Sequence, residues 1–212
     1  MAGVEAAGGG REAGSPRPLP GDGEAAIIAQ SPPAGTAMSR LESMIRRLEA
    51  QVRCLDAAMA AIAGVPGVVL ELGLGNGRTF DHLRERLGGR EILVFERHLI
   101  AHPACVPDDE FLFLGNLEDT LPPLMSRLEG RVVLIHADLG TAAERYPLSL
   151  EKLIAATFPR LLRRDGIVLT DKPLANAGLA PMALPEGVAS GRYHMYRPEP
   201  GPGPGRGKAA PR

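Results

Sequence analysis

The stretch LELGLGNGRT, residues 70–79, places three glycines at alternate positions between an apolar run and a polar run. The preceding run GVVLEL (67–72) is short, continuous and rich in β-branched residues, which is typical of a strand buried on both faces. Glycine adopts backbone conformations that other residues avoid, and it lets other groups approach the main chain closely. The following segment, RTFDHLRERL, predicts a helix whose N-terminus carries partial positive charge. The stretch therefore predicts a strand, a tight loop and a helix that favour a ligand with an anionic or acceptor group.

Strand-like and helix-like segments alternate along the rest of the sequence. Strands are expected at residues 67–72, 91–96, 110–115, 131–138, 165–171 and 191–197, and helices at 78–87, 118–129 and 146–164. For 118–129, a turn leading into a helix is an alternative, because two prolines stand near its start. The alternation predicts the α/β class, with a Rossmann-like, doubly wound, mostly parallel sheet and helices on both faces.

A long amphipathic helix is expected ahead of the first strand. It begins at Ser39, which forms a capping box with Glu42, and it ends near Gly64. Its apolar side chains recur at the helical period, at Leu41, Met44, Ile45, Leu48, Val52, Leu55, Met59 and Ile62. This face is expected to pack on the sheet or on a second copy of the chain, which would make the protein a homo-oligomer.

Composition predicts one folded domain with two disordered extensions. The chain has 212 residues, of which 44% are hydrophobic, enough for a sizeable core. Residues 1–38 and 198–212 are dominated by Gly, Ala, Pro and charged residues, which bury too little surface to offset the entropy of ordering. The folded domain is therefore expected to span residues 39–197.

Charge and cysteine content favour a cytoplasmic protein. The net charge is -1, so the whole chain is not drawn to nucleic acid or anionic lipid. Two cysteines, Cys54 and Cys105, provide neither a disulfide framework nor a zinc site. No apolar stretch approaches the roughly 20 residues that span a bilayer, and no secretory signal is recognisable.

Three phosphate- or nucleotide-binding patterns compete for the glycine stretch. A nucleoside triphosphate loop requires a lysine that is missing here. A dinucleotide fingerprint requires a third glycine where this chain has Arg78 or Phe80, depending on the register. The pattern acidic-x-G-x-G-x-G fits, with Glu71 followed by glycines at 73, 75 and 77. An acidic residue, Glu96, ends the second expected strand and suits hydrogen bonding to ribose hydroxyls, which fits NAD as well.

The acidic-x-G-x-G-x-G pattern resembles motif I of class I S-adenosylmethionine-dependent methyltransferases. That resemblance implies that Glu71 supports the loop or the methionine amino group. Arg78 is expected either to bind the methionine carboxylate as a bidentate pair or to be a solvated arginine in the first turn of the helix. The resemblance also implies that Asn116, in GNLEDTLP, accepts a hydrogen bond from the adenine amino group, although Asp is usual there. The implied cofactor site comprises Glu71, Gly73, Gly75, Asn76, Gly77, Arg78, Glu96, Arg97, Asn116 and Leu117.

The span from Ser39 to Arg197 is similar to a small bacterial family of S-adenosylmethionine methyltransferases whose substrate is unknown. The segments that carry the resemblance are SRLESMIRRLEAQ, LELGLGNGRTFDHLRE, FERHLIAHP, GNLEDTLP and HADLG. The resemblance implies S-adenosyl-L-methionine as cofactor and leaves the methyl acceptor open. His136 and Asp138 end the fourth expected strand, beside the methyl-transfer position in this architecture, so either is expected to orient or deprotonate the acceptor.

The acceptor is expected to be a small molecule. Nucleic acid is disfavoured, because aromatic residues make up only 4% of the chain and no motif for base methylation is present. Metal dependence is not expected: Asp138 and Asp171 stand at neighbouring strand ends, but Lys172 follows the second carboxylate, and the pair His98 and His102 has no third ligand. Two other functions stay open, a non-catalytic module that binds S-adenosylmethionine or S-adenosylhomocysteine and an NAD-linked oxidoreductase.

Overall fold

A computed structural model of the chain describes residues 38–140, 145–175 and 177–199. Within these residues the chain forms one seven-stranded sheet, with strand order β3-β2-β1-β4-β5-β7-β6. The strands are β1 Val68–Leu72, β2 Ile92–Glu96, β3 Leu112–Leu114, β4 Val132–Ala137, β5 Leu162–Thr170, β6 Leu179–Pro181 and β7 His194–Pro198. The extension and tail predicted on either side of the domain lie outside the described residues, apart from Met38, Pro198 and Glu199.

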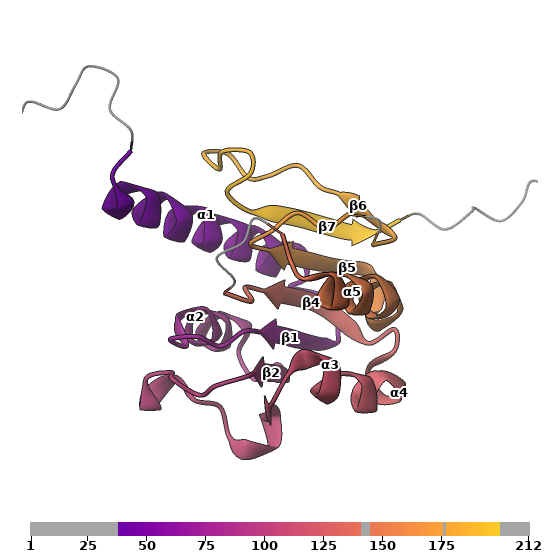
Figure 1. Cartoon of the computed structure of the whole chain (residues 1–212). Coiled ribbons are helices and arrows are strands. Elements are labelled where there is room, and N and C mark those ends of the chain that lie inside the picture. Colours follow the sequence, from indigo (N-terminus) through magenta and orange to yellow (C-terminus); the bar gives the residue numbers. More distant parts are fainter. Residues whose placement is uncertain (1–37, 141–144, 176, 200–212) are drawn as a thin grey trace, which may run out of the picture. The chain divides into compact units, whose positions relative to one another are not determined.

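The first five strands are parallel, and the last two are antiparallel. β1 pairs with β2 and β4, β2 with β3, and β4 with β5, all in parallel, whereas β7 runs antiparallel to β5 and to β6 (Figure 1). The predicted mostly parallel, doubly wound sheet is therefore confirmed. β6 was not expected from the sequence, because three residues are too few to show an alternation.

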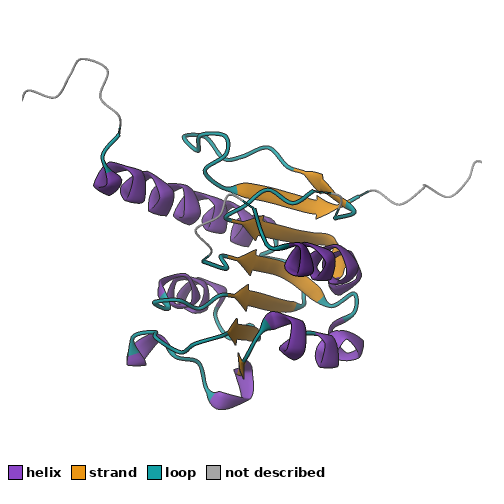
Figure 2. Ribbon diagram, viewed as in Figure 1, coloured by secondary structure: helices purple, strands orange, loops and turns teal. Residues whose placement is uncertain are grey.

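Helices cover both faces of the sheet (Figure 2). α1 (Arg40–Ala61) and α2 (Arg78–Leu87) contribute to one core layer. α3 (Leu117–Thr120), α4 (Met125–Leu128) and α5 (Leu148–Leu161) contribute to the other. The central strands are buried on both faces, since every residue of β1 and β4 is buried, as their continuous apolar runs predict.

The predicted apolar face of α1 is only partly correct. Leu55, Met59 and Ile62 are buried, but Leu41 and Ile45 are 70% and 47% exposed. The N-terminal half of α1 extends past the arrowheads of β4 and β5 (Figure 1), so no sheet lies beneath it. The buried stripe is centred on small or polar residues instead, Ala50, Gln51, Cys54 and Ala58. Small side chains permit the helix to approach the sheet closely, and periodicity alone does not report where the sheet ends.

Proline breaks the helix expected at 118–129. A 3₁₀ turn at Pro122–Leu124 separates α3 from α4, because two successive prolines remove the N–H groups that a continuous helix requires. The alternative of a turn leading into a helix is closer to the structure. The helix expected at 146–164 ends at Leu161, two residues after Pro159, and β5 begins three residues earlier than predicted.

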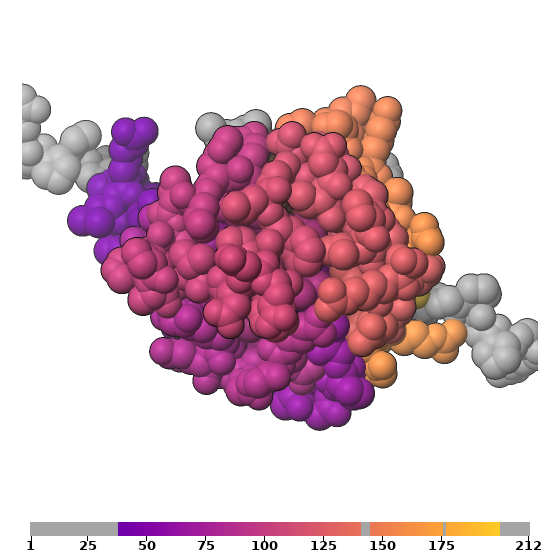
Figure 3. All heavy atoms as spheres, turned by 90° about the horizontal axis from the view of Figure 1, so that it is seen from below, coloured from indigo at the N-terminus to yellow at the C-terminus, as the bar shows by residue number. Residues whose placement is uncertain are grey.

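The connection between β2 and β3 contains two 3₁₀ turns, Pro103–Cys105 and Asp109–Phe111, where a doubly wound sheet ordinarily has a crossover helix. Viewed from below (Figure 3), this part of the chain forms much of the exposed surface. Among the described helices, none is long and apolar enough to cross a membrane.

β2 and β3 lie on one side of β1, whereas β4 and β5 lie on its other side. The direction in which strands are added to the sheet therefore reverses between β1 and β4. Ligands bind in open α/β sheets at the carboxyl ends of the strands at such a reversal. Leu72 pairs with Ala137, and the Asp138 N–H donates to the Leu72 carbonyl over 3.0 Å. The fold thereby places the glycine loop directly beside Asp138.

Candidate active site

Two of the three loop glycines are packed against the protein itself. Gly73, Gly75 and Gly77 have φ angles of 91°, 51° and 83°, in the left-handed region that favours glycine. A Cβ on Gly73 would lie 2.2 Å from the Asp138 carbonyl oxygen, and one on Gly77 would lie 2.4 Å from the Cys105 Cβ. At Gly75 the same test finds no atom within 4 Å, so this glycine faces open space.

The N–H groups of these glycines are all used within the protein. Gly73 donates to the Phe95 carbonyl over 2.8 Å, and Gly77 donates to the Leu74 carbonyl over 2.8 Å. Gly75 donates to Oε2 of Glu96 over 2.9 Å. The glycines therefore shape the loop and connect it to the end of β2, instead of presenting three free donors to a ligand.

Glu96 has one lone pair left for a ligand on Oε2. Its Oε1 accepts from the N–H groups of Arg97 and His98, over 2.6 Å and 2.9 Å, which fills that oxygen. Its Oε2 accepts only from Gly75 among the described residues. A carboxylate oxygen accepts two hydrogen bonds, so a ribose hydroxyl has a position to donate to.

An open cleft of about 820 Å³ lies at this carboxyl edge. Six of the ten predicted cofactor residues line it, namely Gly73, Gly75, Glu96, Arg97, Asn116 and Leu117. Apolar walls come from Phe95, Ile100, Leu139 and Leu150. The Asn116 Nδ2 donates to Oδ2 of Asp119 over 3.3 Å, and no described residue hydrogen-bonds the side-chain Oδ1 of Asn116, which suits an acceptor for an amino group. The cleft and these acceptors fit an adenosyl ligand.

The other four predicted cofactor residues do not line the cleft. Asn76 and Arg78 are exposed outside it, and Gly77 is packed beneath Cys105. Glu71 is 0% exposed. Of the two roles that the resemblance offers for Glu71, its burial fits support of the loop.

Glu71 belongs to a buried chain of polar groups. Its Oε1 accepts a hydrogen bond from the Thr79 hydroxyl, in the first turn of α2. Its Oε2 lies 2.7 Å from the His136 Nδ1. The His136 Nε2 in turn hydrogen-bonds the Tyr193 hydroxyl, and Glu71, His136 and Tyr193 are each 0% exposed. These hydrogen bonds link α2, β1, β4 and the residue just before β7.

Burial and neighbouring charge act in opposite senses on the pKa of His136 and in the same sense on the pKa of Tyr193. Burial lowers the pKa of His136, but the nearby carboxylates, Glu71 above all, outweigh burial and raise it above its ordinary value of 6.5. Burial, helped by the charge of Asp138, raises the pKa of Tyr193 well above 10. Tyr193 therefore remains a neutral phenol that both donates and accepts hydrogen bonds.

The structure separates the two residues predicted to act on the acceptor. His136 is fully buried with both ring nitrogens engaged, so it has no access to the cleft. Asp138 lines the cleft. Its Oδ2 accepts from the Arg47 guanidinium and from Gln51 Nε2, the latter over 3.0 Å, and no described residue hydrogen-bonds its Oδ1.

The second strand-end carboxylate, Asp171, is also occupied. Its Oδ1 accepts from the Tyr146 hydroxyl over 2.6 Å, and the Lys172 Nζ lies 3.4 Å from its Oδ2. Asp138 and Asp171 thus each face a cation of the protein. Among the described residues no group of three or more His, Cys, Asp or Glu side chains is arranged to hold a metal ion.

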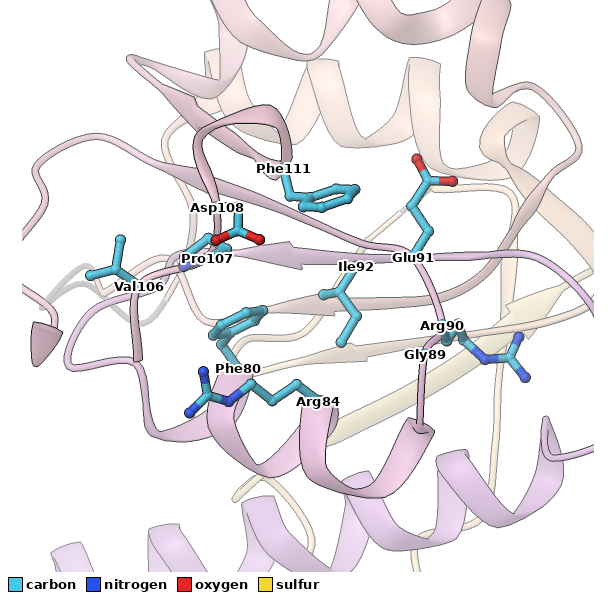
Figure 4. Close-up of a pocket in the computed structure, with 10 residues that line it drawn as sticks. All are labelled: Phe80, Arg84, Gly89, Arg90, Glu91, Ile92, Val106, Pro107, Asp108 and Phe111. Carbon is cyan, nitrogen blue, oxygen red and sulfur yellow. The ribbon is translucent and has the colours of Figure 1, made fainter. Parts of the chain in front are cut away.

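A second hollow, of about 580 Å³, lies beside β2 and the connection that lacks a crossover helix. Phe80, Ile92 and Phe111 line it (Figure 4). None of the predicted site residues contributes to its lining. It is separate from the carboxyl-edge cleft.

Sequence comparison assigns the family. A sequence profile described as S-adenosyl-L-methionine methyltransferase matches residues 38–198, which is most of the chain. The chain belongs to this family. It is an S-adenosyl-L-methionine-dependent methyltransferase with a Rossmann-like fold, as the sequence predicts.

Two solved methyltransferase structures are similar to this chain, and the first supports the assignment. An S-adenosyl-L-methionine methyl transferase from Silicibacter pomeroyi is 39% identical, with a TM-score of 0.70, over 76% of this chain and 99% of that one. A Burkholderia thailandensis 1,6-didemethyltoxoflavin-N1-methyltransferase, solved with 1,6-didemethyltoxoflavin and S-adenosylhomocysteine, is 20% identical, with a TM-score of 0.46, over 81% of this chain and 97% of that one. No curated protein matches the sequence at a significant level.

Sequence reasoning missed four polar residues of the methyltransferase that surround the site, Arg47, Gln51, Thr79 and Tyr193. Arg47 lies off the apolar face that the sequence predicts for this helix, yet it pairs with Asp138. Gln51 could have been noticed, because it is a polar residue within an otherwise apolar stripe of the helix. Thr79 is the last residue of the stretch LELGLGNGRT, eight positions after Glu71. Nothing in the local sequence distinguishes Tyr193, which is joined to His136 across 57 positions.

Proposed function

We propose that this methyltransferase acts on a small-molecule acceptor that binds beside Asp138. The observations that carry the proposal are that Asp138 lines the cleft, that Arg47 and Gln51 hold its Oδ2, and that no described residue hydrogen-bonds its Oδ1. A fixed carboxylate with one free oxygen is suited to accept a hydrogen bond from a hydroxyl or amino nucleophile. The methyl acceptor named for the Burkholderia protein, 1,6-didemethyltoxoflavin, is likewise a small molecule.

The cofactor is proposed to lie in the 820 Å³ cleft, with its ribose at Glu96 and its adenine near Asn116 and Leu117. Gly73, Gly75 and Arg97 complete this proposed set. Glu71, Asn76, Gly77 and Arg78 are proposed to shape or flank the loop, because burial or position keeps them out of the cleft. His136 is proposed to position Glu71 instead of contacting the acceptor.

Bound S-adenosyl-L-methionine supplies an electrophilic methyl group on a positively charged sulfur. The acceptor nucleophile forms a bond to the methyl carbon as the carbon–sulfur bond breaks, and the electron pair of that bond stays on sulfur. Asp138 orients the nucleophile and accepts its proton through Oδ1. Positioning of well-oriented reactants supplies up to about 7–11 kcal/mol of the barrier, so the demand on a base is modest.

The test compares Asp138→Asn with Asp171→Asn. The second carboxylate ends the next strand but does not line the cleft, so it is a matched control. Each protein is incubated with methyl-labelled S-adenosylmethionine and cell extract, and labelled products are separated by size. We expect wild-type label in the small-molecule fraction, a loss of about 100-fold or more in Asp138→Asn, and a much smaller loss in Asp171→Asn.

Label confined to the protein or RNA fraction would contradict a small-molecule acceptor. Equal losses in the two variants would contradict the role of Asp138. Binding of S-adenosylhomocysteine, measured by calorimetry, should be retained in both variants, which separates acceptor chemistry from cofactor binding.

We also propose a cellular location, an excluded class of acceptor and a mode of self-association. A cytoplasmic location follows from composition, and exclusion of nucleic acid as acceptor follows from the scarcity of aromatic residues. Self-association through α1 is supported by its exposed apolar residues, among them Leu41, Met44 and Ile45, which are 70%, 48% and 47% exposed.

A further inference from the structure

Two tyrosines near the C-terminal strand lie on opposite faces of the sheet. Tyr193, just before β7, is 0% exposed and belongs to the core layer shared with α1 and α2. Tyr196, within β7, is 7% exposed and belongs to the layer shared with α5. The Tyr196 hydroxyl accepts from the Leu174 N–H over 2.9 Å. Only Tyr193 reaches the groups beneath the glycine loop.

The Tyr193 hydroxyl joins two branches of polar contacts. In one branch it hydrogen-bonds the Nε2 of His136, whose Nδ1 lies 2.7 Å from Glu71 below the loop. On the other side the Gln51 side chain is near enough to act on the pKa of the Tyr193 hydroxyl, which it lowers against the larger effect of burial, and its Nε2 donates to Asp138 at the cleft. One hydroxyl thus connects the support of the cofactor loop with the carboxylate proposed to face the acceptor.

A hydroxyl is suited to this position, because it both donates and accepts. When His136 is protonated, its Nε2–H donates to the Tyr193 oxygen. When His136 is neutral with its proton on Nδ1, the Tyr193 hydroxyl donates to Nε2. Loss of the hydroxyl leaves a buried ring nitrogen without a partner, and this is most unfavourable for the charged form.

We propose that Tyr193 is a positioning residue of the methyl-transfer site, holding the glycine loop through His136 and Glu71 and holding Asp138 through Gln51. The proposal rests on the function proposed above only for the role of Asp138. The proposed effect of Tyr193 on the glycine loop, and so on cofactor binding, does not depend on which acceptor is methylated.

The protonation state of His136 gives this role a distinctive readout. The charged and titratable groups near His136 are Glu71 on β1, Asp138 after β4, Asp171 after β5 and Tyr193. Arg47, from α1, faces Asp138 and partly offsets its charge. Without the Tyr193 hydroxyl, protonated His136 loses an acceptor while the carboxylates stay, so the pKa of His136 should fall.

The test compares Tyr193→Phe with Tyr196→Phe, which remove the same atom from opposite faces of the sheet. S-adenosylhomocysteine affinity is measured by calorimetry from pH 6 to pH 9, and the His136 ring is followed by nitrogen NMR, with His136→Gln identifying its signal. We expect Tyr193→Phe to weaken binding about 3- to 10-fold near neutral pH. Tyr196→Phe should change binding less than about 2-fold.

The pH dependence separates positioning from loss of packing. In Tyr193→Phe the His136 titration and the alkaline decline in affinity should both move to lower pH, whereas Tyr196→Phe should keep the wild-type profile. Titration of S-adenosylhomocysteine itself affects the wild type and both variants equally, so it cancels in the ratio of their affinities. Equal effects of the two substitutions, or an unshifted profile in Tyr193→Phe, would overturn the proposal.

If Tyr193→Phe does not fold, the proposal is tested on the wild-type protein alone. Its His136 titration should have the same midpoint as the alkaline decline in S-adenosylhomocysteine affinity, and separate midpoints would overturn the proposal. Absence of methyl transfer to small molecules would contradict the proposed acceptor but would leave these binding measurements unaffected, so the two failures are distinguishable.

Discussion

Two glutamates lie near the carboxyl ends of neighbouring strands of the same sheet, yet the fold gives them different environments. Glu71, the fourth residue of the five in β1, is 0% exposed and is held by Thr79 and His136. Glu96, the last residue of β2, lines the cleft and keeps one acceptor position free on Oε2. β1 is central and covered on both sides, whereas β2 is followed by a connection without a crossover helix. Of these two carboxylates at one sheet edge, one is therefore buried below the glycine loop and the other lines the cleft.

The largest expected effect is on stability and comes from Glu71. Glu71→Gln keeps the shape but removes the charge that faces His136, and it places an amide N–H₂ among groups arranged for a carboxylate. Breaking a buried, hydrogen-bonded pair is strongly unfavourable, so we expect a loss of about 2–4 kcal/mol in the free energy of unfolding. Urea denaturation monitored by circular dichroism measures it. A loss below that of Glu96→Gln would remove the contrast between the two glutamates.

The reciprocal effect is on cofactor affinity and comes from Glu96. Hydrogen bonds to charged groups contribute about 1.5–3 kcal/mol, so Glu96→Gln should weaken S-adenosylhomocysteine binding about 10- to 100-fold. Calorimetry measures the change. The cost in stability should be smaller than in Glu71→Gln, because water reaches the partly exposed carboxylate and its donors. Unchanged affinity in Glu96→Gln would show that the ribose binds elsewhere.

The smallest expected effect is the pH dependence of stability. The pKa of His136 is raised in the folded chain, so its stabilisation is complete below the ordinary value of 6.5 and is lost as pH rises through the raised value. Burial lowers the pKa of His194, which acts in the opposite sense on the acid side of 6.5. Burial raises the pKa of Cys54 to about 11, which matters only above pH 9.

As the pH rises from 6.5 through the raised pKa of His136, the free energy of unfolding should therefore decline, by at most about 1.4 kcal/mol per pH unit for one proton. Urea denaturation at several pH values measures the slope, and His136→Gln should abolish this component. A wild-type stability that is flat or rising over this range would contradict a raised pKa for His136.

The sequence predicted the order of elements well where the hydrophobic pattern of a segment directly reflects its burial. The segments that form β1, β2 and β4 are continuous apolar runs because both faces of a central strand are covered. Such runs can be recognised from the sequence alone. The acidic-x-G-x-G-x-G pattern placed the loop at the correct strand end. Prediction was weaker for α1, where Leu41 and Ile45 have apolar spacing but no sheet beneath them.

The candidate site could be predicted only in part, because its residues are defined by where side chains point. His136 and Asp138 stand two positions apart at the end of β4, yet one is sealed in the core and the other lines the cleft. Likewise, the sequence showed that Gly73 and Gly77 need small residues, but not that the closest groups are Asp138 and Cys105 of the chain itself.

The sequence by itself determined the α/β class, the strand-end positions of the glycine loop and of Glu96, and the family with its cofactor. These features are local, since hydrophobic period and glycine spacing act over a few residues. Tertiary structure alone decided that Tyr193 meets His136 across 57 positions, and that Arg47 and Gln51 of α1 hold Asp138. Such contacts depend on strand order and on the packing of a helix against a sheet, so no short stretch of sequence contains them.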